Sequence, residues 1–428
     1  MKDAICAMIG HESAMPMPDQ ERLSWSALAA VLVAMFAITV GYGVALPILP
    51  FLIEQIAGNP APETLSWHTG LLTATYVVAI FLGAPFWGKI SDRHGRKPII
   101  LAGLLGFAAA SGLFSVTGSL PLLYIVRFFA GLFAAAITPV AYALIGDHAP
   151  SKEWRAHRFA LINIAGTAGF FFGPLLGGIA VKIAGRLWSL SPERALSMPL
   201  FAAVILAVFA VILATLLLPG HVKRKIEDTP AEALQAKPDA VLRLLAIAFV
   251  TALAIGAFEV SLSLRGKVLG LDAAHIGAMF AECSLIMAVV QALIFSPLVK
   301  PETTRWMLAP GLAALSVGLI TVSIVTTSIP MSIAVAVVAA SAGILSPIAT
   351  YWASFGVTAS EGANLGRMTA AASLGQAVGS AAGGLLFDVP QFPEASFVLA
   401  AFLVVATLLV SLRLPNLLMP ETAEGKSA

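Results

Sequence analysis

Charged residues are scarce in this chain. Asp, Glu, Lys and Arg make up 11% of its 428 residues, while hydrophobic residues make up 59%. A soluble globular domain is about 25% charged, so this chain has too few charges to keep a protein of its size in solution. The composition excludes a soluble protein and predicts an all-α protein whose helices cross a membrane.

Cysteine is nearly absent as well. The chain has two, Cys6 and Cys283, in different surroundings, so neither a disulfide framework nor a zinc-ligand spacing is available. The glycine-containing segment from Gly88 to Lys97 lacks the Gly-Lys-Ser/Thr ending and the context of a P-loop, which argues against ATP-driven transport. Catalytic triads and metalloenzyme patterns are also missing, and the net charge of +2 is spread over short segments. We therefore expect no enzymatic activity, no cofactor and no nucleic-acid partner.

Twelve apolar segments are long enough to cross a bilayer, for which a helix needs about 20 mostly apolar residues. We expect helices near 25–53, 68–88, 98–117, 121–146, 158–184, 197–218, 241–263, 274–299, 306–326, 330–352, 364–387 and 395–415. The first 22 residues are too polar for the apolar region of a signal peptide and are expected to form a tail.

A polar interruption from His221 to Asp239 divides these segments into two sets of six. We predict an N-terminal bundle over 23–218, a linker over 219–240 and a C-terminal bundle over 241–417, with tails over 1–22 and 418–428. Of the 25 lysines and arginines, 19 lie on one side of this topology, 5 on the other, and Arg127 within a span. Because cytoplasmic loops are enriched in these residues, both chain ends are expected in the cytoplasm.

The two halves share a glycine pattern. The glycines of the fifth predicted helix recur in the eleventh at a spacing of 206 residues, as Gly169, Gly173, Gly177 and Gly178 and then Gly375, Gly379, Gly383 and Gly384. Duplicated halves are typical of transporters that bind substrate near the membrane midplane, between the halves.

The segment from Gly88 to Lys97 is unusually rich in charge and reads Gly-Lys-Ile-Ser-Asp-Arg-His-Gly-Arg-Lys. Gly88 and Gly95 are expected to permit a tight turn. Asp92 is expected to face the positive end of a neighbouring helix.

The same pattern, Gly-x-x-x-Asp-Arg-x-Gly-Arg-Lys, resembles the signature loop between helices 2 and 3 of the major facilitator superfamily. The resemblance implies a latch that holds the two halves together in the outward-facing state, formed by Gly88, Asp92, Arg93, Gly95 and Arg96. Arg96 is expected to pair with Asp147, at the end of the fourth helix. The alternative is an anchor that only sets the topology.

Arg127 is a cation inside a predicted span, where a charge costs about 2.5–3.5 kcal/mol on insertion scales and is functional by default. With Gly131 four residues later, it resembles a second motif of the superfamily, which is tied to proton coupling. Ala130 stands where that motif usually has Gln. The first helix also lacks the buried acid that some relatives pair with this arginine, and Tyr42 is its prominent polar side chain. The alternative is an arginine that extends to the membrane surface.

The fifth helix resembles a third motif, Gly-x-x-x-Gly-Pro-x-x-Gly-Gly, which marks exporters that exchange substrate for protons. Its glycines let helices approach closely, and Pro174 removes a backbone hydrogen bond and bends the helix. We expect these residues, with the equivalent glycines of the eleventh helix, to form a pivot between the halves. The alternative is ordinary helix packing.

Two acids, Glu259 and Glu282, fall inside predicted spans. Burial disfavours the charged form of a carboxyl, so each is a candidate proton carrier, although packing or contact with water would also explain it. Tyr42, Arg127, Glu259 and Tyr351 are expected near the midplane cavity.

Met279 and Cys283 share a helical face, with Glu282 beside them. Together these side chains are weak candidates for a soft or borderline metal. Met and Cys at this spacing are more often packing residues.

The resemblance spans the whole chain and is closest to the drug:proton antiporter branch, which includes tetracycline exporters. It implies twelve helices in two pseudo-symmetric halves, rocker-switch alternating access and proton-coupled export of a small molecule. It also implies a monomer in the lipid bilayer of the bacterial inner membrane. One alternative is a transporter of iron or another metal ion in the magnetosome membrane. Another is a non-transporting sensor, because residues 296–305 lack the glycines and the Asp of the first-half loop.

Overall fold

The computed structural model describes residues 23–150, 152–187, 192–220, 238–294, 299–354, 361–387, 389, 392 and 394–418. The predicted tail over 1–22 and residues 221–237 of the predicted linker lie outside this part of the chain, as do residues 419–428. The regular elements within it are helices.

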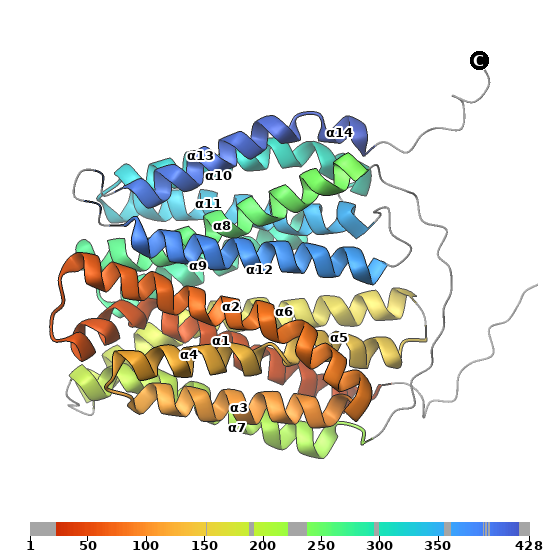
Figure 1. The fold of residues 1–428 in the computed structure, drawn as a ribbon, viewed down its shortest axis with the longest axis horizontal. Coiled ribbons are helices and arrows are strands. Elements are labelled where there is room, and N and C mark those ends of the chain that lie inside the picture. Colours follow the sequence, from red (N-terminus) through yellow and green to blue (C-terminus); the bar gives the residue numbers. More distant parts are fainter. Residues whose placement is uncertain are drawn as a thin grey trace, which may run out of the picture.

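The helices form two bundles, which are stacked in Figure 1. The N-terminal half contains α1 (Trp25–Ala57), α2 (Pro62–His94), α3 (Arg96–Val116), α4 (Leu120–Ala134), α5 (Ile137–Asp147), α6 (Lys152–Leu187) and α7 (Pro192–Leu217). The C-terminal half contains α8 (Pro238–Val268), α9 (Ala273–Ile294), the 3-10 helix η2 (Pro301–Met307), α10 (Leu308–Ile324), α11 (Ser328–Ser354), α12 (Glu361–Leu385), α13 (Ala395–Ser411) and α14 (Leu414–Leu417).

Ten described helical segments are long and apolar enough to cross a membrane, with α4 and α5 together forming one of them. The shorter α13 is also apolar. α12 has the length but is rich in glycine, alanine and serine, as suits a helix enclosed between α8 and α2. The predicted fold class, twelve membrane helices in two halves, is confirmed.

The fourth predicted helix is interrupted, contrary to the prediction of one helix over 121–146. It is divided at Ala135 and Ala136 into α4 and α5. Pro139 explains the break, because it has no N–H for the carbonyl of Ala135, four residues earlier, and its ring crowds that carbonyl.

The predicted turn beginning at Gly88 is also wrong. α2 continues to His94, and Gly88 is one of its helical residues. Gly95 alone separates α2 from α3, with a φ of 92° that favours glycine. The charged segment is therefore the end of one helix and the start of the next.

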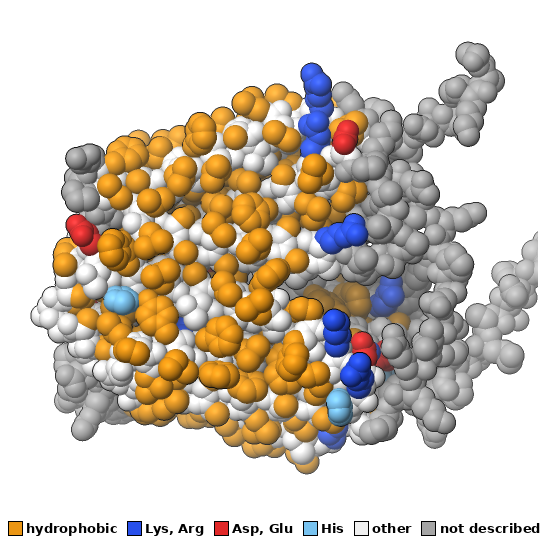
Figure 2. Space-filling view, in the orientation of Figure 1, with side chains coloured by type: hydrophobic (Ala, Val, Ile, Leu, Met, Phe, Trp, Pro, Cys, Tyr) orange, Lys and Arg blue, Asp and Glu red, His pale blue; other side chains and the backbone are white. Residues whose placement is uncertain are grey.

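The two ends of the bundle differ in charge. We call the end where α2 stops and α3 begins the basic face, since Lys89, Arg93, Arg96 and Lys97 lie there. The other end, where α1 stops and α2 begins, is the opposite face. Figure 2 shows Lys and Arg side chains gathered at one end, with hydrophobic side chains covering much of the remaining visible surface. Exposed Leu, Ile, Val and Phe side chains along the helices fit contact with lipid.

Each half has its own hydrophobic core. One core is built from buried residues of α1 to α7 with Ala377 added, and the other from residues of α8 to α14 with Leu46 added. Because few residues are shared, the two bundles are packed against each other as separate bodies.

The repeated glycines have matching positions in the two halves. The first three of each set face the first helix of their own half, where Gly173 meets Val40 and Gly379 meets Leu253. The fourth faces the other half: Gly178 lies against Ala273 and Ala274 of α9, and Gly384 lies against Gly70 of α2. Backbone therefore meets backbone along four helix pairs, which are α1–α6, α8–α12, α6–α9 and α2–α12.

Gly379→Ala is predicted to destabilise the protein, because the added methyl group would overlap the carbonyl oxygen of Leu253. Overpacking of this kind costs about 1–3 kcal/mol. Gly366→Ala on the same helix is the matched control, since nothing lies within 4 Å of its added methyl group. There the change is expected to be neutral or stabilising, by about 0.5–1 kcal/mol. Thermal unfolding in detergent measures both, and equal midpoints for the two variants would contradict the packing described.

Candidate functional site

Three polar side chains meet between the halves, near the middle of the membrane. The hydroxyl of Tyr42 on α1 donates a hydrogen bond to Oε2 of Glu259 on α8, at 2.9 Å. The amide of Gln376 on α12 donates to the same oxygen at 3.3 Å. Glu259 is 5% exposed. Both donors reach Oε2, and the other carboxyl oxygen accepts no hydrogen bond from a described residue.

The internal repeat explains why Tyr42 and Glu259 meet. α1 and α8 begin at the basic face, and the pairs Tyr42–Glu259 and Leu46–Ser263 both have a sequence separation of 217 residues. The two helices therefore lie side by side in the same direction, with equivalent positions in contact.

Arg127 is enclosed in aromatic side chains. Its guanidinium carbon lies 4.5 Å from the ring centroid of Tyr76, 5.6 Å from that of Phe114 and 5.7 Å from that of Tyr42. The residue is 4% exposed, so the alternative of an arginine extending to the membrane surface is wrong. Within the described residues, Nε and Nη2 have no hydrogen-bond partner. Cation–π contacts with three rings hold the charge in place.

Tyr42 connects the cation to the acid. The ring of Tyr42 stacks on the ring of Tyr76, with the ring centroids 5.1 Å apart, and its hydroxyl donates a hydrogen bond to Glu259. The acid that the first helix lacks thus comes from α8, in the other half. Tyr76 and Gln376 were missed from the sequence. Gln376 could have been identified from the sequence because it is a polar amide inside a predicted span. No sequence feature singles out Tyr76.

The other predicted cavity residues do not join this group. Glu282 is partly exposed on α9. Tyr351 lies near the basic-face end of α11, with its ring edge-on to Trp352 at 5.5 Å. Cys283 belongs to the core of the C-terminal half, and Met279 packs against that core. The described residues contain no group of three or more His, Cys, Asp or Glu side chains able to hold a metal ion.

Two prolines create hydrogen-bond acceptors between the halves. Pro50 and Pro174 lack an N–H, so each leaves the carbonyl four residues earlier without its helical donor. Those carbonyls belong to Leu46 and Phe170, and they accept hydrogen bonds from Ser263 at 3.1 Å and Ser284 at 3.3 Å. Both serines come from the C-terminal half. Each hydroxyl also lies near a carbonyl of its own helix, which gives it a second acceptor when the halves part.

Ion pairs connect the halves at the opposite face. Lys267 Nζ lies 2.5 Å from Glu54 Oε1, and Lys182 Nζ lies 4.0 Å from Asp272 Oδ2. Partial burial raises the pKa of Asp272, but hydrogen bonds from the backbone and ring of His275 outweigh that effect and hold it below its usual value. Asp272 therefore stays ionised and able to pair.

The halves are thus closed at the opposite face. The hydrogen bonds and ion pairs that join described residues of different halves all lie between the middle of the spans and that face. The contacts of Gly178 and Gly384 lie there too.

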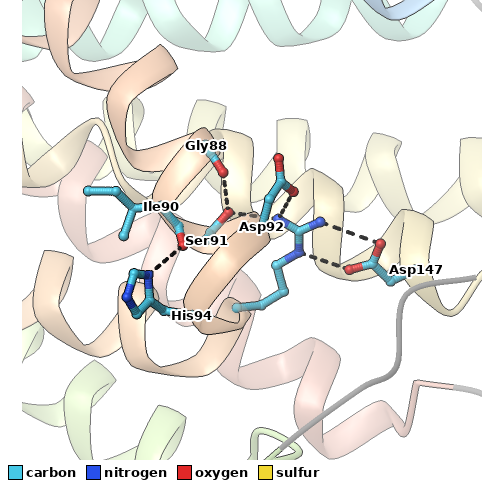
Figure 3. A network of polar contacts seen from close by, with 7 residues as sticks. Gly88, Ile90, Ser91, Asp92, His94 and Asp147 are labelled. Atoms are coloured by element: carbon cyan, nitrogen blue, oxygen red, sulfur yellow. Dashed lines mark hydrogen bonds and ion pairs between the residues drawn. The ribbon is translucent and has the colours of Figure 1, made fainter. Parts of the chain in front are cut away.

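The charged segment forms a network at the basic face, drawn in Figure 3. Arg96 donates to Asp147 Oδ2 at 2.8 Å, to Asp92 Oδ1 at 2.7 Å and to the hydroxyl of Ser91 at 2.7 Å. The predicted Arg96–Asp147 contact is present. Asp92 has Arg96 as its partner rather than a helix end.

These contacts all lie within the N-terminal half. Arg96 bonds residues of α2 and α5, and Lys97 donates to the carbonyls of Thr215 and Leu218, which caps the end of α7. Gly88 contributes its carbonyl, which accepts from Ser91. Arg93 is exposed. The network orders the end of the N-terminal half while the halves are closed at the opposite face.

Comparison with known proteins decides the family. The model of the Major Facilitator Superfamily matches residues 31–363. The chain belongs to this superfamily. It is a multi-pass membrane transporter for small molecules and not an enzyme.

Two of its relatives are resistance proteins by name. It is 28% identical to the class C tetracycline resistance protein of Escherichia coli, over 75% of this chain and 79% of that one. It is 25% identical to multidrug resistance protein 2 of Bacillus subtilis (strain 168), over 83% and 87%. The fold matches the human organic anion transporter MFSD10 with a TM-score of 0.66 at 19% identity, over 90% of this chain and 99% of that one.

Replacing both Ser263 and Ser284 by Ala is predicted to open the opposite face. Each neutral hydrogen bond is worth about 0.5–1.5 kcal/mol, so the double variant is expected to lower the closed population about tenfold. A short thiol cross-linker between Lys182→Cys and Asp272→Cys, in a background without native cysteines, reports that population as a reaction rate. Ser341→Ala is the control, because that serine bonds only its own helix among the described residues. An unchanged rate in the double variant would contradict the role given to the two serines.

Proposed function

We propose that this protein is a secondary active exporter that exchanges a small organic substrate for protons by rocker-switch alternating access. The observation that carries the proposal is Glu259, a buried carboxyl held by donors from both halves, Tyr42 and Gln376. A proton carrier in an exchanger has to respond to the position of the halves, and this carboxyl lies at their contact.

The coupling follows from the cost of burying charge. When the opposite face opens, the Tyr42–Glu259 contact separates and water reaches the carboxyl, which then releases or binds a proton freely. A carboxylate is costly to enclose within a membrane, whereas a protonated carboxyl still accepts both hydrogen bonds through Oε2. Protonation therefore favours the closed arrangement seen here. Opening of the basic face next delivers the proton to the other side.

The direction of transport comes from topology. If the basic face is cytoplasmic, as the positive-inside rule predicts, protons enter the cell while substrate leaves. The proposal is of a monomer in the bacterial inner membrane, with both chain ends in the cytoplasm.

The substrate class comes from the named relatives, which confer resistance to tetracyclines, quinolones and several drugs. Iron or another metal is disfavoured, because Met279 and Cys283 pack with the C-terminal core rather than forming a ligand set. A sensor without transport is disfavoured by the same relatives. We take an amphipathic drug-like molecule as the substrate.

The Arg96 network is proposed to act as the latch of the N-terminal half. Arg96 stands at the first residue of α3, where a positive charge opposes the helix dipole, and Asp147 stands at the last residue of α5, where a negative charge opposes it. The ion pair offsets both unfavourable helix-dipole interactions and holds the ends of α2, α3 and α5 together, so that they move as a rigid unit. The rocking motion requires such a unit.

Glu259→Gln is predicted to abolish proton coupling. Purified protein in liposomes, driven by a pH gradient, is expected to transport tetracycline, and the variant to lose this uptake by more than about tenfold. Its tetracycline exchange without a gradient should persist, since Gln still accepts a hydrogen bond from Tyr42. Glu282→Gln is the matched control and should keep gradient-driven uptake. Full gradient-driven uptake by Glu259→Gln, or its loss in Glu282→Gln alone, would assign the proton to another group.

Arg96→Gln is predicted to slow transport about tenfold while lowering the unfolding midpoint only slightly. Hydrogen bonds to charged groups are worth about 1.5–3 kcal/mol, but Asp92 and Asp147 remain partly exposed and solvated in the variant. Lys89→Gln, an exposed cation near the end of α2 at the same face, is the control. If Arg96→Gln transports substrate at the rate of the control, the Arg96 network does not act as a latch.

A further inference from the structure

A small cavity lies inside the N-terminal half, away from the contact between the halves. It is enclosed by α1, α3, α4 and α7, and its polar lining residues are Arg127 and Ser111. Phe107 and Phe114 supply aromatic walls, and small or aliphatic side chains supply the rest. The space admits about one water-sized particle.

The guanidinium of Arg127 belongs to a residue that lines this cavity, and two of its donors are enclosed by protein and unused by any described residue. Nε and Nη2 have no hydrogen-bond partner in the described part of the chain, and the residue is 4% exposed. The rings of Tyr76, Tyr42 and Phe114 attract the cation. They accept no ordinary hydrogen bond, so buried N–H groups remain that are costly to leave unsatisfied.

The charge of Arg127 is also unbalanced. No described acid forms an ion pair with it, and Glu259 reaches it only through Tyr42. A buried cation without an anion is strongly disfavoured.

We propose that this cavity binds a monovalent inorganic anion of the size of chloride, held by the guanidinium of Arg127 and the hydroxyl of Ser111. Both groups donate hydrogen bonds, and no carboxylate lines the space. A carboxylate, phosphate or sulfate is too large for it. The anion is thus a resident counter-ion of the N-terminal half rather than a transported substrate, and the proposal stands independently of the transport cycle.

The test is anion-dependent stability of the purified, full-length protein in detergent at constant ionic strength. Chloride and bromide are expected to raise the unfolding midpoint by about 2 °C or more, with saturation, because a ligand of the native state stabilises it. Gluconate is expected to have no such effect. Equal midpoints in chloride and gluconate would overturn the proposal and leave water as the occupant.

Variants locate the effect. Arg127→Met is expected to abolish the difference between chloride and gluconate, and Ser111→Ala to weaken the apparent chloride affinity several-fold. Arg158→Met is the matched control, because Arg158 also lies over aromatic rings, those of Trp25 and Trp154, but does not line the cavity. If Arg127→Met fails to fold, Ser111→Ala and the anomalous scattering of bromide in crystals decide. A halide effect unchanged by Ser111→Ala, or bromide bound elsewhere only, would refute the site.

Discussion

The structure depends on the close approach of backbones at the contact between the halves. In the hydrocarbon region every carbonyl needs a donor from the protein, and Pro50 of α1 and Pro174 of α6 each remove one such donor. Ser263 of α8 reaches the carbonyl in α1, and Ser284 of α9 reaches the carbonyl in α6, where Gly178 lets α6 and α9 approach closely. Closure of the opposite face thus depends mainly on contacts made by the backbone, and side-chain ion pairs add to them.

The charges inside the membrane are arranged around that contact. Arg127 belongs to the N-terminal half and Glu259 to the C-terminal half, and Tyr42 contacts both. Any motion that separates α1 from α8 changes the surroundings of the acid and leaves the aromatic group around the cation intact. The Tyr42 hydroxyl then couples protonation of Glu259 to the movement of the halves, and no long network of polar residues is needed.

Much of this could be predicted from the sequence. The length of the apolar segments predicted the membrane helices, and the internal repeat predicted the matching glycine positions. Both features can be recognised in the sequence without knowledge of which helices touch. The Arg96–Asp147 pair was also predicted, since both residues stand at helix ends on the same face.

The remaining features depend on three-dimensional packing. Gly88 was taken for a turn residue, although glycine is tolerated in a helix, and Gly95 alone has the left-handed φ. Tyr76 and Gln376 acquire their roles only when α2 and α12 lie beside α1 and α8. The serines opposite Pro50 and Pro174 could not be paired with them without knowledge of which helices touch. Tyr351 was expected near the middle of its span from its residue type, whereas it lies toward the basic-face end of α11.

The central claim is that protonation of Glu259 favours closure of the opposite face. Spin labels at Asn59→Cys and Leu269→Cys, both exposed at that face, give the distance between the halves by pulsed electron resonance. The account predicts that the short-distance population grows as pH falls, and that Glu259→Gln shows the same proportion of short and long distances at every pH, equal to that of the unchanged protein at low pH. A pH response that is reversed, or one that persists unchanged in Glu259→Gln, would contradict it.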